Sequence, residues 1–156
     1  MCKNLKLIVL AIDEKNILAI DNMGMCYNMK KEYKTALVYF KKSGSDYALD
    51  SMVEIYYYTD DNDAAFDLGN KLIKDGKASA YHYYVVGDIL FGRKKYDDAI
   101  PLLKKSLSLK DTSATFNQLG FCYQRKKRYD LAILYYEKGV DKEQMQSNYY
   151  ENCIAI

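Results

Sequence analysis

The chain has 156 residues, a net charge of only +2, and hydrophobic residues at 49% of its positions. This size suits a single domain spanning residues 1–156, and so small a charge does not favour a nucleic-acid-binding protein. No apolar run approaches the roughly 18 residues that a membrane-spanning helix requires, so the sequence gives no indication of a membrane protein.

Residues 1–16 are expected to form a short N-terminal helix. Leu5, Ile8 and Ile12 recur at helical spacing, so this segment serves either as half of a preceding repeat or as a cap. The apolar stretch 7–12 is too short for a signal peptide.

From residue 17 onward, one phrase recurs three times. An apolar residue is followed four positions later by a glycine, and an alanine stands twelve positions after that glycine. The last two copies begin 33 residues apart, which predicts one helix-turn-helix unit copied along the chain, each copy burying its apolar face against its neighbours. The repeated small residues are Gly24, Gly87 and Gly120, followed by Ala36, Ala99 and Ala132.

The repeated glycine needs a physical reason, because glycine inside a helix costs about 1 kcal/mol relative to alanine. We expect each glycine to allow two helix backbones to approach closely, with the repeated alanine as the small residue opposite. Few helix breakers are present, since the chain has eight glycines and one proline. The composition therefore agrees with an all-helical fold.

A fourth, degenerate copy is expected between the first two clear ones. Ala64 is taken as its alanine, which puts Met52 in the position of the glycine. The join before this copy is short, with Gly44 as the expected helix stop and Ser45 as the next N-cap.

The phrase resembles the tetratricopeptide repeat. Leu119, Gly120, Tyr123, Ala132 and Tyr136 match its pattern, Phe116 stands in place of the tryptophan, and the closing proline is missing. The resemblance implies an all-α, right-handed α-solenoid of about four helix-turn-helix repeats, with some Sel1-like character in the short first join. The expected segments are 1–16, 17–44, 45–79, 80–112, 113–140 and a C-terminal capping helix over 141–156.

No constellation for catalysis is apparent, and we expect no enzyme activity, catalytic residue, metal site or cofactor. The single histidine, His82, has no Asp, Ser or Cys beside it. The acidic run 60–63 lacks the downstream ligands of a calcium loop. The four cysteines fit no zinc spacing, which favours a reduced, cytoplasmic protein.

The resemblance also implies a concave groove lined by the first helix of each pair. This groove is expected to be apolar and aromatic, with a few carboxylates, and to bind a protein or peptide partner that carries Lys or Arg. Its expected residues are Asp21, Met25, Leu49, Asp50, Val53, Tyr56, Tyr57, Tyr81, Tyr84, Asp88, Phe91, Asn117 and Phe121.

Family members that hold acidic chaperone tails use a clamp of Lys, Asn and Arg side chains. None of the matching positions here carries Lys, Asn or Arg, which argues against such an adaptor. These positions are Asp21, Met25, Asp50, Tyr81 and Val85.

Two alternatives to a groove-binding scaffold stay open. Basic residues gather in the turns around 30–34, 93–95 and 125–128. They either stabilise helix C-termini or form a ridge that binds RNA or an acidic partner. A homo-oligomeric structural role is the second alternative.

Overall fold

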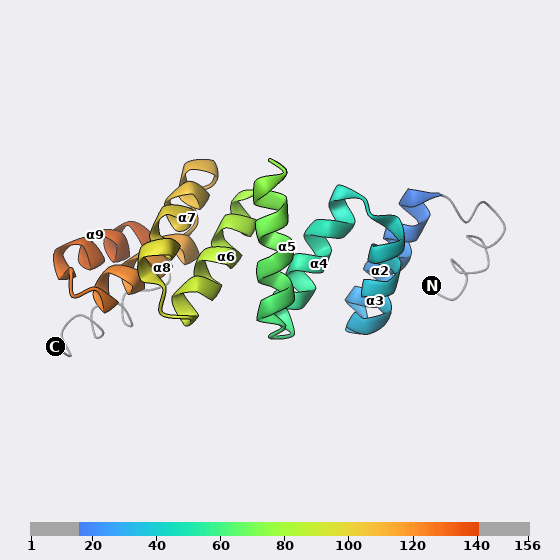
Figure 1. Cartoon of the computed structure of the whole chain (residues 1–156), viewed down its shortest axis with the longest axis horizontal. Helices are drawn as coiled ribbons and strands as arrows, with labels where there is room; N and C mark the ends of the chain where they lie inside the picture. Colours follow the sequence, from blue (N-terminus) through green and yellow to red (C-terminus); the bar gives the residue numbers. More distant parts are fainter. Residues whose placement is uncertain (1–15, 141–156) are drawn as a thin grey trace. The chain divides into compact units, whose positions relative to one another are not determined.

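The computed structural model describes residues 16–140, and every regular element among them is a helix (Figure 1). This confirms the all-helical fold. The N-terminal helix expected before Asn16 and the cap expected over 141–156 lie outside the described residues. The helices are α2 (Ile17–Met29), α3 (Tyr33–Ser43), α4 (Asp46–Tyr58), α5 (Asn62–Lys74), α6 (Ala80–Gly92), α7 (Tyr96–Leu109), α8 (Ser113–Arg125) and α9 (Tyr129–Gly139).

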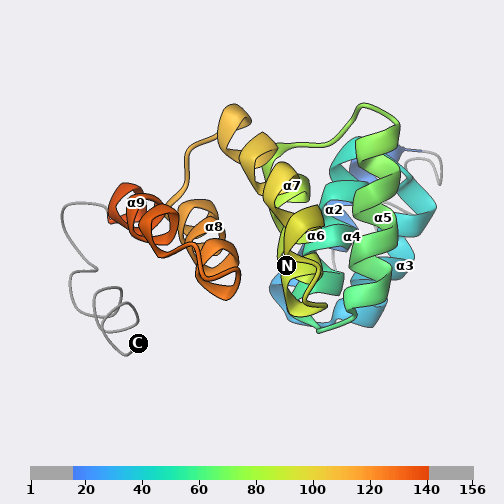
Figure 2. The same ribbon diagram turned by 60° about the vertical axis from the view of Figure 1, so that its left-hand side comes forward.

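The chain divides into two compact units, 1–68 and 69–156, with the division inside α5. In the first unit α2 packs against α3, and α4 contacts both helices. In the second unit α6 pairs with α7 and α8 with α9, while α8 also contacts both helices of the preceding pair (Figures 1 and 2). Each of the four expected repeats contains two consecutive helices.

The three clear pairs share one packing device, in which a large side chain of the second helix lies over the glycine of the first. A Cβ added at Gly24 would lie 2.5 Å from a ring carbon of Phe40, and one at Gly87 would lie 2.8 Å from Cγ of Leu103. At Gly120 the ring of Tyr136 occupies the same place. The large residue always stands sixteen positions after its glycine.

The expected close approach of two backbones is seen at Gly87, where an added Cβ would lie 3.5 Å from the carbonyl oxygen of Ala99, but the large side chain over the glycine was not expected. Ala36, Ala99 and Ala132 are fully buried, but the side chain over each glycine belongs to the residue one helical turn after the alanine. Because the glycine has no Cβ, a bulky side chain of the second helix fits against the backbone of the first. The small alanine, one turn earlier on the second helix, allows the same close contact between the two helices.

The turns inside the four pairs have the same backbone geometry. Each contains one non-glycine residue in the left-handed region, namely Lys31, Asp60, Lys94 or Lys127, with φ between 58° and 61°. The following N–H returns to a carbonyl of the first helix, as in the 2.9 Å bond from Lys95 to Leu90. This is the Schellman arrangement that ends helices at a left-handed residue.

These landmarks correct the register of the degenerate pair by one residue. In the clear pairs the left-handed residue stands seven positions after the glycine, and the N-cap of the first helix stands eight positions before the same glycine. Counting back from Asp60, or forward from the N-cap Ser45, leads to Val53 and not to Met52. The equivalent alanine is Ala65, which is fully buried, whereas the expected Ala64 is only half-buried.

The degenerate pair lacks the packing device of the clear pairs. Val53 stands where the other pairs have glycine, and Gly69 stands sixteen positions later, where they have a large side chain. A Cβ added at Gly69 would lie 2.7 Å from Cγ2 of Val86, so this glycine makes room for a side chain of α6.

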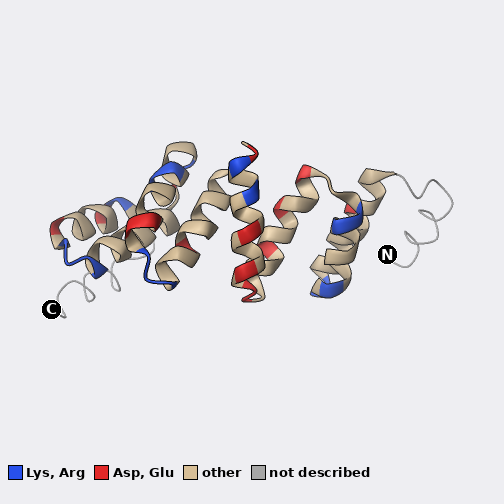
Figure 3. Ribbon diagram, viewed as in Figure 1, with Lys and Arg blue, Asp and Glu red and all other residues tan. Residues whose placement is uncertain are grey.

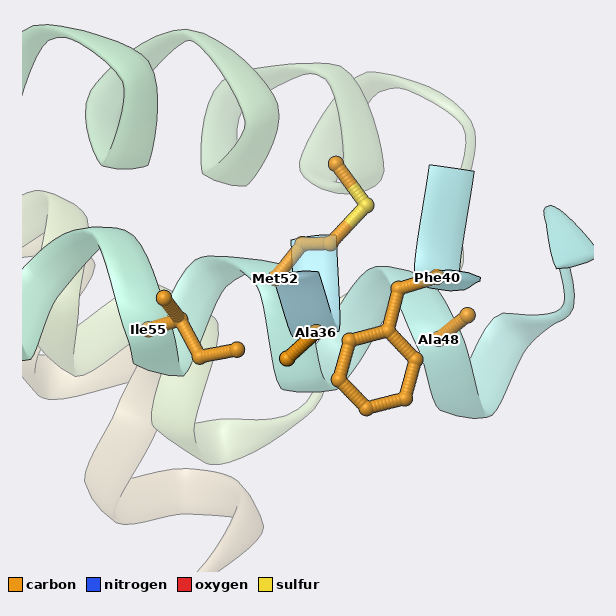
Figure 4. Close-up of a cluster of buried hydrophobic side chains, with 5 residues drawn as sticks. All are labelled: Ala36, Phe40, Ala48, Met52 and Ile55. Carbon is orange, nitrogen blue, oxygen red and sulfur yellow. The ribbon is translucent and has the colours of Figure 1, made fainter. Parts of the chain in front are cut away.

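Met52 belongs to the core between neighbouring pairs in the first unit. It packs with Ala36, Phe40, Ala48 and Ile55 (Figure 4). The short join leads directly into this core. Gly44 has φ 64° after α3, and the Ser45 Oγ accepts a 3.0 Å hydrogen bond from the N–H of Ala48, as the sequence predicts. The Sel1-like interpretation of this join stays a prediction.

Substitution of the packing glycine should destabilise the fold, despite the better helix propensity of alanine. We expect Gly87→Ala to lower the free energy of unfolding by about 1–3 kcal/mol, because the new Cβ would press on Leu103. Gly92→Ala on the same helix is the control, since its Cβ would meet nothing within 4 Å and should be neutral or stabilise by up to ~1 kcal/mol. Urea unfolding measures both; equal effects would contradict the packing role.

The corrected register predicts opposite tolerance at two adjacent alanines. Ala65→Leu should cost about 1–3 kcal/mol, because the added atoms enter a filled interior. Ala64→Leu should change stability by less than about 1 kcal/mol, because this position is half-exposed. Thermal melts of the two variants compare them directly, and a larger loss in Ala64→Leu would restore the original register.

Candidate functional site

An aromatic surface joins the first helices of the two pairs in the second unit. The rings of Phe91 on α6 and Phe121 on α8 lie 6.3 Å apart at an angle of 42°. Tyr81 and Tyr84 stack near the other end of α6, with centroids 6.5 Å apart. Asp88 shares the face of Tyr84 and Phe91, because these residues are four and three positions apart on one helix. We call Tyr81, Tyr84, Asp88, Phe91 and Phe121 the aromatic face.

Residues of the second helices support the aromatic face from behind. Phe121 meets the ring of Tyr136 edge-on at 5.5 Å, and the Tyr136 hydroxyl donates a 2.9 Å hydrogen bond to Oε1 of Gln124. Tyr96 packs against Phe91, also at 5.5 Å. The rings of Phe91 and Phe121 are therefore half-buried and held in place, which lowers the entropy lost when a ligand binds.

The expected groove residues of the second unit differ in how accessible they are to a ligand. Asn117 is half-buried and its Oδ1 lies beside Gly139 of α9, where a Cβ would clash with it. Tyr81 is 37% exposed and is the most accessible ring of the face. Asp88 is half-buried close to Cys122, whose thiol it influences electrostatically.

The first unit departs further from the expected groove. Asp21 is 7% exposed and accepts a 2.8 Å hydrogen bond from Ser45 Oγ, so it fastens the N-cap of α4 and does not face a ligand. Val53 is fully buried, and Tyr56 packs against the core of Figure 4. The burial of Val53 follows from the shifted register, and the contacts of Asp21 and Tyr56 follow from packing between repeats. Met25 and Asp50 are exposed, and Leu49 and Tyr57 are half-buried.

The register error also left two tyrosines out of the expected groove. Counted from Val53, Tyr47 takes the position of Tyr81, six residues before the glycine of its pair, and Tyr58 stands five residues after Val53, as the expected Tyr57 does when counted from Met52. Tyr47 and Tyr58 are 49% and 70% exposed. A signal for them was present in the sequence. Ser45 is a strong N-cap candidate, and the distance of eight residues from N-cap to glycine in the other pairs leads to Val53.

The histidine has a structural task. His82 is fully buried at the third position of α6, and its Nδ1 accepts a 3.0 Å hydrogen bond from the N–H of the N-cap Ser79. Such a contact closes the first turn of a helix. Within 16–140, no group of three His, Cys, Asp or Glu side chains could hold a metal ion. None of the helices in this range is both long and apolar enough to cross a membrane.

Comparison with known proteins identifies the repeat. Residues 114–141, which span α8 and α9, match the family model of the tetratricopeptide repeat. The chain carries a tetratricopeptide repeat. Its fold is that of tetratricopeptide proteins, since the crystal structure of YrrB, described as a TPR protein with an unusual peptide-binding site, superposes with a TM-score of 0.81. That match covers 98% of this chain and 81% of YrrB at 15% identity.

Two further proteins are similar to this chain, one in structure and one in sequence. The crystal structure of MamA matches with a TM-score of 0.76 and 24% identity, over 91% of this chain and 86% of that one. An uncharacterized protein of Guillardia theta, ycf37, is 34% identical over 74 residues. That alignment covers 44% of this chain and 42% of ycf37, so less than half of either protein is compared.

The buried thiol of the tetratricopeptide repeat should be chemically inert. Burial, followed by the charge of Asp88, raises the pKa of Cys122 to about 12. Since a thiol in an unfolded chain titrates near ~8.5, the folded state keeps its proton at higher pH. The free energy of unfolding should therefore fall as the pH rises above the unfolded value.

A variant that retains only Cys122 should react slowly with a thiol reagent at mildly alkaline pH and rapidly after unfolding in urea. A variant that retains only Cys26, which is half-buried, is the control. Equal rates for native and unfolded Cys122 would show that this thiol is exposed.

Proposed function

We propose that the chain is a non-enzymatic interaction scaffold whose aromatic face binds an apolar peptide or helix carrying Lys or Arg. The observation that carries this proposal is the contact between Phe91 and Phe121, which brings the first helices of neighbouring repeats together on one surface. Sites for peptides combine apolar anchor surfaces with a few placed polar groups. Asp88 supplies a carboxylate one helical turn from Phe91.

The chemistry of the face suits a cationic side chain better than an anionic one. A Lys or Arg can cover the rings with its aliphatic stem while its head reaches a carboxylate. Arginine also stacks on aromatic rings, and such contacts contribute about 0.5–2 kcal/mol. An acidic peptide would instead meet the like charge of Asp88, which argues again against an adaptor for acidic chaperone tails.

The relatives support a scaffold in outline. YrrB is described as having a peptide-binding site, and its fold matches that of this chain, although the residues of that site are not transferred at 15% identity. A cytoplasmic location stays a prediction and forms part of this proposal.

Binding to a peptide array tests the proposal. We expect selected peptides to be apolar with at least one Lys or Arg. Phe121→Ala should weaken them by about tenfold or more, because buried aromatic anchors dominate such contacts. Asp88→Asn should weaken Lys-bearing peptides by about tenfold and leave their neutral Lys→Gln versions unchanged.

Leu109→Ala is the matched control, because Leu109 is a half-exposed apolar residue of the same unit outside the aromatic face. The proposal fails if the selected peptides bind the parent protein and Phe121→Ala equally well. It also fails if the aromatic face selects acidic peptides.

A further inference from the structure

Two turns of the second unit concentrate positive charge at one edge. The turn between α6 and α7 contains Arg93, Lys94 and Lys95, and the turn between α8 and α9 follows Arg125 with Lys126, Lys127 and Arg128 (Figure 3). All of these side chains except Lys126 are exposed. Lys126 forms an ion pair with Asp97, at the start of α7, which draws the two turns together. We call this surface the basic turns.

Lysine occupies positions in these turns where it reduces stability. Lys94 and Lys127 have φ of 60° and 58°, a conformation that costs a residue with a Cβ roughly 1–2 kcal/mol. The chain does use glycine in turns between pairs, where Gly44 and Gly76 have φ of 64° and 70°. The turns inside the pairs could have used glycine in the same way.

The next residue in each basic turn does not cap the helix that it precedes. Lys95 and Arg128 are the N-caps of α7 and α9, and neither side chain makes a capping hydrogen bond. A cation at this place also faces the positive end of the helix dipole. By contrast, the N-cap Thr112 caps α8 through its side chain, as Ser45 caps α4.

The degenerate pair shows that the residue before the second helix of a pair can cap that helix. There Asp61 precedes α5, and its Oδ1 accepts a 3.3 Å hydrogen bond from the N–H of Ala64. The basic residues of the second unit therefore cannot be explained as helix stabilisers alone. Residues that lower local stability indicate positions where a requirement other than stability, such as binding, determines the residue type.

We propose that the basic turns form a second binding surface, separate from the aromatic face, for an acidic segment of a partner protein. Arg93, Lys94, Lys95, Arg125, Lys127 and Arg128 supply the positive charge. Lys126 is already paired with Asp97 and is not counted among them.

Carboxylates beside the turns favour a peptide over a nucleic acid. Asp97, Asp98 and Asp130 are exposed in the first turns of α7 and α9, and they would repel a continuous chain of phosphates. A segment with spaced Glu or Asp side chains can place its charges on the lysines and avoid these carboxylates.

The position of the lysines allows binding and stability to be separated in one variant. Lys94→Gly/Lys127→Gly removes two charges and the left-handed strain, so we expect Tm to rise by roughly 2–8 °C. The same variant should weaken binding of a fluorescent peptide of alternating Glu and Gly by about tenfold, measured by anisotropy at low salt. Lys95→Ser should behave alike, because serine restores the missing cap. Arg128 is left unchanged, because its guanidinium lies 5.7 Å from the ring centroid of Tyr123 and a substitution would also remove that contact.

Lys105→Ser/Lys110→Ser is the control, since it removes the same charge from exposed positions toward the other end of α7. It should change peptide affinity by no more than about twofold. A short oligouridylate of equal charge is the comparison ligand, and the proposal requires that it bind less tightly than the Glu peptide at the same salt concentration.

Three results would overturn the proposal: no binding of the Glu peptide, unchanged affinity in the glycine variant, or tighter binding of the oligouridylate. The result is independent of the aromatic face. Phe121→Ala should leave Glu-peptide binding intact, and Lys94→Gly/Lys127→Gly should leave binding of Lys-bearing peptides to the aromatic face intact.

Discussion

The fold depends on a size complementarity between the two helices of a pair. Because Gly24, Gly87 and Gly120 have no Cβ, the second helix can place Phe40, Leu103 or Tyr136 against the backbone of the first. This contact determines which side of the first helix is buried against the second helix and which side faces away from it. In the last pair it also reaches the surface directly, since the ring of Tyr136 lies over Gly120, meets Phe121 and carries the hydroxyl that binds Gln124. The core and the aromatic face are built on the same side chain.

The sequence was sufficient to predict the helix pairs, because the glycines and alanines recur at constant spacing and the breakers fall between them. It failed by one residue in the degenerate pair for a physical reason. Met52 and Val53 are both apolar and both buried, and Ala64 stands beside Ala65, so hydrophobicity alone cannot choose between two registers. The N-cap Ser45 and the left-handed Asp60 decide the question. A left-handed aspartate cannot be recognised in advance, whereas the N-cap could have been used.

Predicting the site was harder than predicting the fold. Helical spacing correctly placed Tyr84, Asp88 and Phe91 on one side of α6, but their contact with α8 depends on packing between repeats that spacing does not contain. Asp21 illustrates the opposite failure. Its position is equivalent to those of Asp50 and Tyr84, and only the hydrogen bond from Ser45, 24 residues away, turns it into a structural residue. A carboxylate on the first helix is therefore evidence for a ligand site only where no side chain of the following repeat forms a hydrogen bond with it.

The two surfaces of the second unit differ in how far stability alone explains them. Phe121 of the aromatic face also packs against Tyr136, so its presence is compatible with a purely structural role. The basic turns are different, because Lys94, Lys127 and Lys95 each occupy a position where a small or capping residue would stabilise the fold. Natural sequences are usually consistent between local preference and global structure. Three departures of the same charge at one edge, beside well-formed caps elsewhere in the same unit, are thus stronger grounds for a role in binding than the hydrophobic surface provides.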